Sequence, residues 1–493
     1  MTTLADALRE AARDTPDRVL VRDDVAELTC AGLLDQATGL AYALMSRMPV
    51  GSVVSFTVPN WHEAAVIYLG ATLAGMVVNP ILPSLRDREL NFILADADSR
   101  MIFIPESFGG HDYAAMLDRV VAQLPNPPEV VVVRGRGAFA DLVGEPGGGD
   151  LPALDPDATR MILYTSGTTG RPKGVLHSHR SLHALIDQLG KFWRIEPGDT
   201  FLVPSPIAHI GGSIYAFECP LLLGTEAVLM QRWDPDAAVG LMQRHRCTHM
   251  AGATPFLTGL LAAAERGQTR LPDLKVFICG GASVPPSLIQ RANDYFDKAA
   301  VTRVYGSTEV PVTTVGALDD VGRSADTDGR PGIADVILVD DEIRARGPQM
   351  LTGYLHDEDN RESFDESGYF RTGDLGRFTD DGCLVVTGRA KDIIIRNGEN
   401  ISPKEVEDLL VTHPQIAEIA VVGIPDPRTG ERAVAAIVPA EATTPGVAEL
   451  KEFLLAHGVA KFKVPEQVVL VEALPKNDAG KVLKHVIKAE LKE

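Results

Sequence analysis

The chain has 493 residues, of which 45% are hydrophobic and 23% are charged, and its formal net charge is −20. A chain of this length exceeds what one hydrophobic core ordinarily supports, so we expect two or more domains. The acidic balance disfavours nucleic acid as a partner, because a phosphate backbone attracts basic surfaces.

Five cysteines are scattered along the chain, an odd number without Cys-x-x-Cys spacing. This pattern argues against a disulfide framework and against a structural zinc site. Residues 1–6 lack the basic and then apolar pattern of a secretion signal. The longest apolar run, residues 64–78, is short for a bilayer span. We therefore expect a soluble, cytoplasmic protein, which does not yet indicate a function.

The first 125 residues alternate between helical and strand patterns. Helices are expected over residues 33–44, 62–74 and 90–95, and strands over residues 53–58 and 101–104. Alternation of this kind predicts α/β layers around a largely parallel sheet. Residues 134–157 are rich in Gly, Pro and Asp, so we expect an exposed connection there.

Residues 161–175 join an apolar run, MIL, to a polar and glycine-rich stretch, YTSGTTGRPKGV. The run has the pattern of a buried strand, and the glycines let backbone N–H groups approach a phosphate closely. The hydroxyl groups add donors, and Lys173 adds a positive charge. The stretch indicates a site for a nucleotide triphosphate, with an ordinary surface loop as the alternative. It is not a P-loop, whose Gly-Lys pair is followed by Ser or Thr, because here Lys173 precedes Gly174.

Residues 164–175 resemble the signature loop of the adenylate-forming enzymes, which include acyl-CoA synthetases, firefly luciferase and peptide-synthetase adenylation domains. Weaker matches at residues 59–63 and 75–80 extend the resemblance toward the N-terminus. The resemblance implies that this loop holds the phosphates of ATP. The residues implied are Thr165, Ser166, Gly167, Thr168, Thr169, Gly170 and Lys173.

Three of the histidines that follow the loop are considered for a role in the site. His177 and His179 are expected at the surface or packed against the loop. His209 matches an aromatic-His-x-x-Gly element that the family has beside its carboxylate substrate. A lone histidine is usually a core residue, but the glycines and Tyr215 that follow favour a site here. Ala208 replaces the aromatic residue common in the family and should leave extra volume near the acyl group. The acid site implied by the resemblance comprises His209, Ile210, Gly211, Gly212, Tyr215, Gly280 and Gly281.

Residues 275–279 have the pattern of a strand and lead into a glycine-rich turn, residues 280–285. Glycines at a strand end let a flat ligand lie against the backbone, and α/β proteins bind ligands at the carboxyl ends of their strands. The resemblance makes this turn a wall of the adenine and acyl pockets. It adds Gly281, Ala282 and Ser283 to the nucleotide site.

Residues 305–309 supply an aromatic face for adenine, hydroxyl groups for the α-phosphate and a carboxylate for Mg²⁺. The resemblance gives these roles to the tyrosine, the threonine and the glutamate of the stretch. The nucleotide and metal ligands implied are Tyr305, Gly306, Ser307, Thr308 and Glu309. Arg303 departs from the family, which often has an asparagine at this position.

The resemblance adds two residues to the nucleotide site and places the hinge close behind them. A carboxylate can accept two hydrogen bonds from a ribose diol, and Asp374 holds the position that does so in the family. Arg389 is implied as a second contact to the ribose or a phosphate. Lys391 falls where the family has the hinge between its two domains.

Beyond the hinge the pattern becomes that of a compact α+β domain. Strands are expected over residues 393–395, 417–422 and 433–438, and helices over 403–411 and 447–455. Asn397, Gly398 and Glu399 resemble the segment that lines the pantetheine tunnel in CoA-forming members, although Asn397 replaces a glycine. Lysine-rich tails are ordinarily solvated. Lys481, however, matches the lysine of a terminal loop that enters the active site in the family.

The segments that resemble the adenylate-forming enzymes follow one another in the same order as in that family, from residue 59 to residue 484. They predict an α/β fold, with a large multi-layer N-terminal domain of mostly parallel sheets (residues 1–390) hinged to a small α+β domain (391–493). The implied activity is that of an ATP-dependent carboxylic acid–CoA ligase, which uses ATP, Mg²⁺ and coenzyme A and forms an acyl-adenylate. Its catalytic residues would be Lys481, Thr165, Glu309 and His209.

Two alternatives stay open. A ligase that loads an acyl carrier protein would share every motif, and a non-catalytic binder of nucleotide or acyl ligands would share the fold. The first is disfavoured because no carrier domain is evident in the chain. The second would lack Lys481, Glu309 or Thr308, which are all present. The acid and the oligomeric state, including a homo-oligomer, are left open.

Overall fold

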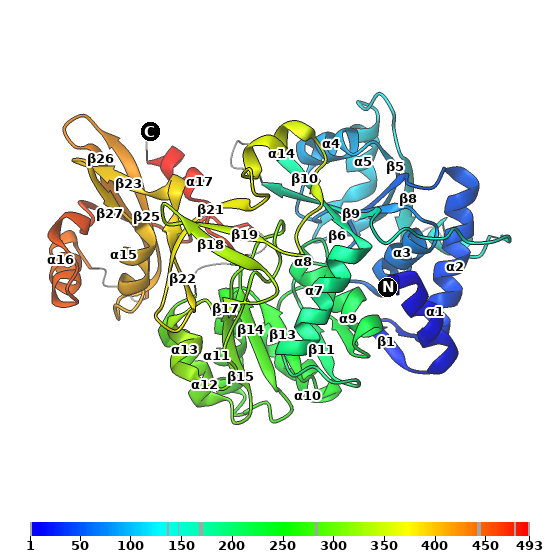
Figure 1. The fold of residues 1–493 in the computed structure, drawn as a ribbon, viewed down its shortest axis with the longest axis horizontal. Coiled ribbons are helices and arrows are strands. Elements are labelled where there is room, and N and C mark those ends of the chain that lie inside the picture. The colour runs from blue at the N-terminus through cyan, green and yellow to red at the C-terminus, as the bar shows by residue number, and fades with distance from the viewer. Residues whose placement is uncertain are drawn as a thin grey trace.

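A computed structural model describes residues 2–135, 138–145, 147–166, 171–281, 284–440, 445–477 and 480–491. Two seven-stranded sheets form its large N-terminal part (Figure 1). The first contains, in spatial order, β15 (Ala300–Val304), β14 (Val276–Gly280), β13 (His249–Gly252), β11 (Thr200–Val203), β12 (Glu226–Leu229), β1 (Val19–Arg22) and β2 (Glu27–Thr29). The second contains β20 (Gly353–Tyr354), β10 (Pro172–Ser178), β9 (Thr159–Ser166), β4 (Val77–Pro80), β3 (Val53–Phe56), β5 (Ser99–Pro105) and β8 (Glu129–Val133).

Most strand pairs in these two sheets are parallel, as the alternating pattern predicts. Antiparallel pairing occurs between β1 and β2, between β9 and β10 and between β10 and β20. Parallel neighbours need crossover connections, which here are mostly helical. The predicted α/β class with mostly parallel sheets is confirmed.

Helices pack on the sheets and between them. The N-terminal helices are α1 (Leu4–Asp14), α2 (Cys30–Arg47), α3 (His62–Leu73), α4 (Asp87–Asp96), α5 (Tyr113–Val121), α6 (Ala138–Val143) and α7 (His179–Phe192). The next are α8 (Ile210–Ser213), η1 (Ile214–Glu218), α9 (Cys219–Leu222), α10 (Pro235–His245), α11 (Thr254–Arg266), α12 (Pro286–Tyr295), α13 (Val321–Asp326) and α14 (Asp357–Ser363). Helix α3 carries most of the longest apolar run and is buried from residue 63 to residue 73, as expected for a helix packed on every side. None of the described helices has both the length and the apolar character that a membrane crossing requires.

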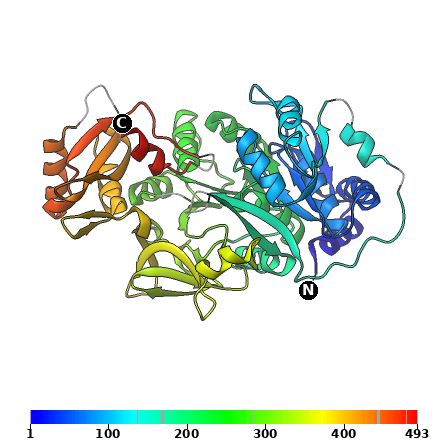
Figure 2. The same ribbon diagram turned by 90° about the horizontal axis from the view of Figure 1, so that it is seen from above.

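A smaller antiparallel sheet follows the large sheets in the chain. It contains β18 (Asp335–Val339), β19 (Glu342–Arg346), β21 (Phe370–Phe378) and β22 (Leu384–Arg389). Figures 1 and 2 show this sheet, in yellow, between the large part and the C-terminal domain. Two-stranded pairings complete the N-terminal part: β6 (Ser107–Phe108) with β7 (His111–Asp112), and β16 (Thr314–Val315) with β17 (Arg330–Pro331).

The small C-terminal domain has its own sheet and core. Its elements are η2 (Ala390–Asp392), β23 (Ile394–Arg396), β24 (Glu399–Ile401), α15 (Pro403–Leu410), β25 (Ile416–Asp426), β26 (Gly430–Pro439), α16 (Val447–Ala456), η3 (Lys461–Lys463), β27 (Gln467–Leu470) and α17 (Lys484–Glu490). The two core clusters of this domain draw only on residues between 394 and 491. The predicted domain boundary falls within η2, and the predicted strands and helices match the observed ones to within a few residues at each end.

One feature differs from the sequence-based expectations. The connection expected over residues 134–157 contains the short helix α6, whose Phe139 and Leu142 are buried. Of the two positions expected for the histidines beside the loop, surface or packed, the surface is excluded, since His177 and His179 are both buried. The prediction about the cysteines holds: all five lie in described residues, are buried and form no disulfide.

Candidate active site

The predicted phosphate loop joins two antiparallel strands. β9 ends at Ser166 and β10 begins at Pro172, which is its register partner. The apolar run that precedes the loop is buried, as predicted. Thr165 and Lys173 lie opposite each other across the hairpin. The other predicted ligands in the two glycine-rich turns, Gly167, Thr168, Thr169, Gly170, Ala282 and Ser283, lie outside the described residues.

Three of the predicted nucleotide ligands meet at one carboxylate. The hydroxyl of Tyr305, which follows β15 directly, donates to Asp374 Oδ2 at 2.9 Å. Arg389 Nε donates to Asp374 Oδ1 at 2.7 Å. Burial, reinforced by the charge of Asp374, raises the pKa of Tyr305 well above its ordinary value, so its hydroxyl remains a donor. The arrangement presents an aromatic ring, a carboxylate and a guanidinium together, as a site for adenine and ribose would require.

Lys481, from the far end of the chain, lies at the same place. Burial, together with the positive charges of Arg389 and Lys391, lowers the pKa of Lys481 to about 8, although Asp374 acts in the opposite sense. The residue as a whole is exposed to solvent, while its ammonium group lies near enough to Asp374, Arg389 and Lys391 to be affected by their charges. The adjacent Gly480 abuts Pro255 of α11: an added Cβ would lie 2.9 Å from Pro255 Cγ. The terminal loop therefore reaches into the N-terminal domain.

Hydrogen bonds hold the stretch that runs from Tyr305 to Glu309. The Ser307 hydroxyl accepts a hydrogen bond from the N–H of Val310. The imidazole of His177 lies 2.8 Å from the carbonyl oxygen of Thr308, and burial lowers the pKa of His177 to about 4. The neutral ring thus donates from Nε2 and holds the backbone of Thr308.

Glu309 accepts a hydrogen bond from the Tyr354 hydroxyl at 3.1 Å. The residues that the structure describes include no ion pair with Glu309, so its negative charge is available to a cation. A carboxylate with this charge is a suitable ligand for Mg²⁺. Glu309 is therefore a residue that could hold a magnesium ion.

The predicted acid site contains one side chain without a partner. His209 caps the N-terminus of α8, and its buried Nε2 has no hydrogen-bond partner among the described residues. Burial lowers the pKa of His209 to about 4, so the imidazole is neutral. Next to it, Gly211 faces open space, whereas a Cβ on Gly212 would lie 2.1 Å from the carbonyl oxygen of Pro206. An acceptor or donor from a ligand would complete the hydrogen bonding of His209.

Other residues predicted for the acid site differ in their surroundings. Tyr215 lies in η1 and stacks on Phe201, with ring centroids 4.9 Å apart, inside the main core. Gly280 ends β14, close to Val304 of the neighbouring strand, and Gly281 follows with φ of +81° and open space beside it. Ile210 is partly exposed at the start of α8. The open positions in this region are thus Gly211 and Gly281.

The comparisons with known proteins agree with this geometry. A family model described as AMP-binding enzyme matches residues 8–355, and one described as the AMP-binding enzyme C-terminal domain matches residues 405–481. The chain belongs to the AMP-binding enzyme family. The predicted membership of the adenylate-forming superfamily, in its acyl-CoA synthetase branch, is confirmed.

Two curated relatives span nearly the whole of this AMP-binding enzyme. The medium-chain fatty-acid–CoA ligase of Escherichia coli (strain K12) is 34% identical over 517 residues, which cover 99% of this chain and 90% of the relative. The 3-[(3aS,4S,7aS)-7a-methyl-1,5-dioxo-octahydro-1H-inden-4-yl]propanoyl:CoA ligase of Rhodococcus jostii (strain RHA1) is 33% identical over 516 residues, which cover 100% of this chain and 99% of the relative.

A further relative has solved structures in two states, with ATP bound and in the apo form. ATP-bound MatB from Rhodopseudomonas palustris matches with a TM-score of 0.89 at 27% identity, covering 99% of each chain. The apo form matches with a TM-score of 0.80 at 28% identity, covering 100% of this chain and 99% of the other. The chain as a whole is therefore more similar to the ATP-bound form than to the apo form.

The predicted CoA-binding segment of the AMP-binding enzyme is a tight hairpin. Arg396 of β23 pairs with Glu399 of β24, which leaves Asn397 and Gly398 as a two-residue turn. Both have left-handed backbones, with φ of +51° and +81°. Asn-Gly is the favoured pair for this type of turn. Asn397 thus adopts a left-handed conformation that glycine adopts readily, and Asn397, Gly398 and Glu399 are exposed.

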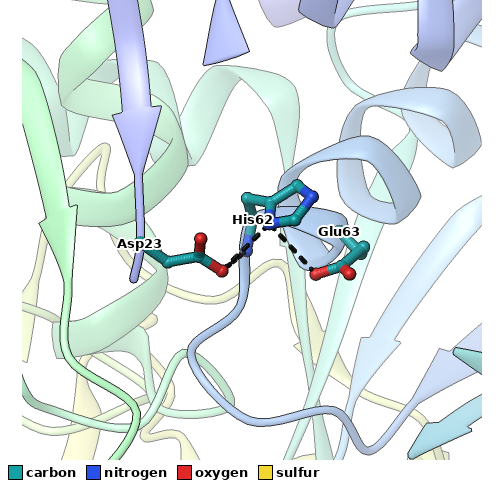
Figure 3. A group of neighbouring side chains, drawn as sticks. All are labelled: Asp23, His62 and Glu63. Atoms are coloured by element: carbon teal, nitrogen blue, oxygen red, sulfur yellow. Dashed lines mark hydrogen bonds and ion pairs between the residues drawn. The ribbon is translucent and has the colours of Figure 1, made fainter. Parts of the chain in front are cut away.

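A cluster of acidic side chains lies outside the proposed active site. Figure 3 shows Asp23 and Glu63 on either side of the His62 ring; their carboxylates lie 2.9 and 3.3 Å from its Nδ1. The spacing of the three residues would admit a metal ion. Arg134 already supplies a positive charge to these carboxylates, because its guanidinium lies 2.5 Å from Asp23 and 2.6 Å from Glu63. We interpret the cluster as an ion-pair network that joins three segments of the N-terminal domain.

Sequence reasoning missed a buried ion pair between β9 and η1. Arg160 Nη2 lies 2.7 Å from Glu218 Oε1, and both side chains are at most 2% exposed. The Tyr68 hydroxyl donates to the same oxygen at 2.7 Å. The pair links the strand that leads into the phosphate loop with the helix that follows His209. The sequence shows Arg160 before one apolar run and Glu218 within another. Nothing in it indicates that these two residues, 58 positions apart, form a pair.

Proposed function

We propose that this AMP-binding enzyme joins a carboxylic acid to coenzyme A in two half-reactions. The observation that carries the proposal is the convergence of Lys481, from the C-terminal domain, with Asp374, Arg389 and Tyr305 of the N-terminal part. Such a convergence between two domains supports a site that is assembled for one step and opened for another.

In the first half-reaction, a carboxylate oxygen of the acid attacks the α-phosphorus of ATP. The bond from that phosphorus to the bridging oxygen breaks, which releases pyrophosphate and leaves an acyl-adenylate. The protein has to align the attack and neutralise developing charge rather than form a covalent bond. We assign these tasks to the backbone and hydroxyls of the phosphate loop, to Thr308 and to the ammonium group of Lys481. His209 would contact the carboxylate of the acid.

Mg²⁺ bound to Glu309 would neutralise phosphate charge when the nucleotide is present. Glu309 and the hydroxyl groups near it supply only oxygen ligands, which this ion prefers. Tyr354 would orient the carboxylate of Glu309 through the hydrogen bond at 3.1 Å.

In the second half-reaction, the CoA sulfur attacks the acyl carbon, the thiol gives up its proton and AMP leaves. We propose that the C-terminal domain turns about Lys391 before this step and withdraws Lys481. Asn397, Gly398 and Glu399 then contact the pantetheine arm. Their exposure in the present arrangement supports a role that begins only after the turn.

We propose an acid of medium length or with a ring rather than acetate. Ala208 and Gly211 remove bulk beside His209, and Gly211 faces open space. Tyr215, a large side chain that could fill this space, stacks on Phe201 in the main core, and Met250 is buried in a second core cluster. Gly212 does not contribute volume, since its Cα already lies against Pro206.

A screen of pyrophosphate release tests the proposal. The purified enzyme receives ATP and Mg²⁺ with one acid at a time from acetate, fatty, aromatic and alicyclic classes, with and without CoA. We expect release with medium-length or ring-bearing acids and thioester only with CoA. Thioester formation on an acyl carrier protein but not on CoA would favour the carrier-loading alternative. An enzyme that binds ATP but releases no pyrophosphate with any acid would favour the non-catalytic binder.

A further inference from the structure

Carboxylates outside the phosphate loop hold both strands of its hairpin. On the β9 side, the Tyr164 hydroxyl donates to Asp96 Oδ2 at 2.8 Å. On the β10 side, Lys173 Nζ lies 3.2 Å from Asp359 Oδ1. His356, at the start of α14, lies 2.8 Å from Asp96 Oδ1 and so joins the two anchors. The hairpin is therefore fixed close to the loop that it carries.

Asp359 contacts two basic residues of the hairpin. Its Oδ2 accepts from Arg171 Nη2 at 2.9 Å, and its Oδ1 faces Lys173. The side chains of Asp359 and Lys173 are only 9% and 11% exposed, so water competes little with this pair. Glu358 also contacts Arg171, at 3.0 Å, but it is 72% exposed. The two neighbouring acids thus share Arg171 as a partner but differ in exposure, and of the two only Asp359 contacts Lys173.

The contacts of Lys173 continue toward the proposed metal ligand. Lys173 Nζ lies 5.2 Å from the centroid of the Tyr354 ring, a favourable distance for a cation over an aromatic face. The hydroxyl of the same tyrosine donates to Glu309 Oε1. Asp359, Lys173, Tyr354 and Glu309 therefore form a continuous line from α14 to the proposed site of the phosphates.

We propose that Asp359 is a positioning residue that sets where the ammonium group of Lys173 stands and thereby determines the affinity for the triphosphate of ATP. This inference rests on the proposed function, in which Lys173 contacts ATP. An ammonium group on a flexible stem has many positions available, and a buried carboxylate partner restricts them. Without that partner, Lys173 would be free to move before ATP binds. The conformational entropy lost when ATP orders it would then weaken ATP binding.

The matched pair Asp359→Asn and Glu358→Gln tests this proposal. Each removes one carboxylate partner of Arg171, but only the first removes the partner of Lys173. In the pyrophosphate-release assay, we expect Asp359→Asn to raise KM for ATP at least about tenfold, the loss typical of one misplaced charge-assisted contact. KM for the acid should change much less. Glu358→Gln should stay within about threefold of wild type for both substrates, as for an exposed ion pair.

A double-mutant cycle with Lys173→Met separates positioning from general support. If Asp359 acts through Lys173, adding Asp359→Asn to Lys173→Met should change KM for ATP little further. Calorimetric titration with a non-hydrolysable ATP analogue should show the same loss of affinity, independently of turnover. A KM for ATP that is unchanged, or that rises together with KM for the acid, would overturn the proposal. Additive effects in the cycle would do the same.

Two controls keep the result interpretable. If Asp359→Asn fails to fold, Asp359→Glu retains the charge but displaces it, and we still expect a raised KM for ATP. An unchanged value would then overturn the proposal. A wild-type enzyme that releases no pyrophosphate with any acid refutes the proposed function. A wild-type enzyme that adenylates normally, with Asp359→Asn behaving as Glu358→Gln, refutes only the role of Asp359.

Discussion

Arg389 Nε lies 2.7 Å from Asp374 Oδ1, and the two residues are direct cross-strand partners in β22 and β21. The second oxygen of Asp374 accepts from Tyr305. Both oxygens of the carboxylate are therefore held in place by the protein itself. A group oriented in this way is prepared to bind a ribose diol without further ordering.

Asp374→Asn should reduce recognition of the ribose. The substitution keeps the size of the side chain but removes its negative charge. It also replaces one oxygen, which accepts hydrogen bonds, with an amide nitrogen, which only donates them. We expect kcat/KM for ATP in adenylation to fall at least about tenfold, because contacts to a charged group are lost. The preference for ATP over 2′-deoxy-ATP and 3′-deoxy-ATP should also shrink. A variant that keeps the wild-type preference among the three nucleotides would show that Asp374 serves only to hold Arg389.

Glu309→Gln should slow adenylation severely while the fold is retained. The amide cannot supply the negative charge that attracts Mg²⁺. Pyrophosphate release is measured over a range of Mg²⁺ concentrations, together with the melting temperature. Normal release at ordinary Mg²⁺ would remove Glu309 from the mechanism, and a large drop in melting temperature with little kinetic effect would identify a structural role.

Lys481→Ala should affect one half-reaction only. A single charge-assisted contact at the reacting phosphate supplies roughly 3 kcal/mol. At about 1.4 kcal/mol per tenfold, adenylation should slow by at least roughly a hundredfold. Thioester formation from pre-made acyl-adenylate and CoA should stay near wild type, because the lysine has then been withdrawn. Lys391→Pro, which stiffens the proposed hinge, should retain adenylation and lose thioester formation. Equal slowing of both halves by Lys481→Ala would mean that the lysine holds the domains together.

The pH dependence of adenylation should report the same lysine. Burial and neighbouring positive charges lower the pKa of Lys481 to about 8, so its ammonium form is lost at a lower pH than that of an ordinary lysine. Since the protonated form is the active one, kcat/KM for ATP should fall as pH rises through about 8. Lys481→Arg keeps its charge at high pH, so the fall should disappear. A fall that persists unchanged in Lys481→Arg would assign the titration to another group.

The buried ion pair of Arg160 and Glu218 should be important for stability. Glu218→Gln leaves the guanidinium buried without a counter-charge, which should destabilise the protein by about 3–5 kcal/mol. Replacing both partners together, as Arg160→Met with Glu218→Leu, should recover most of this loss. The midpoints of urea unfolding compare the variants. A Glu218→Gln variant as stable as wild type would show that water or Tyr68 already compensates Arg160.

The sequence predicted most elements and the segments that meet at the candidate site, because both depend on local patterns. Buried strands such as residues 161–163 have apolar runs, and Tyr305, Asp374 and Lys481 stand in short motifs that a resemblance can identify. The roles of these residues remain predictions, but the structure does bring the three together.

Other relationships depend on which segments meet in space and could not be read from the chain. The sequence indicates only a phosphate-binding role for Lys173. Its contact with Asp359 is visible only in the fold. The sequence leaves His177 either at the surface or packed against the loop, and only the fold shows that its imidazole lies 2.8 Å from the carbonyl oxygen of Thr308. Asn397 seemed a departure from the family, whereas its left-handed backbone explains why an asparagine is tolerated there.

The burial of all five cysteines has a practical consequence for measuring this enzyme. Burial raises the pKa of the Cys247 and Cys279 thiols to about 12, so they carry little reactive thiolate near neutral pH. A colorimetric thiol reagent added to the native enzyme should therefore detect CoA and not the protein. Consumption of the free thiol during the second half-reaction can then be followed directly, with a low background, and treating the enzyme with an alkylating agent before CoA is added should leave its cysteines unmodified.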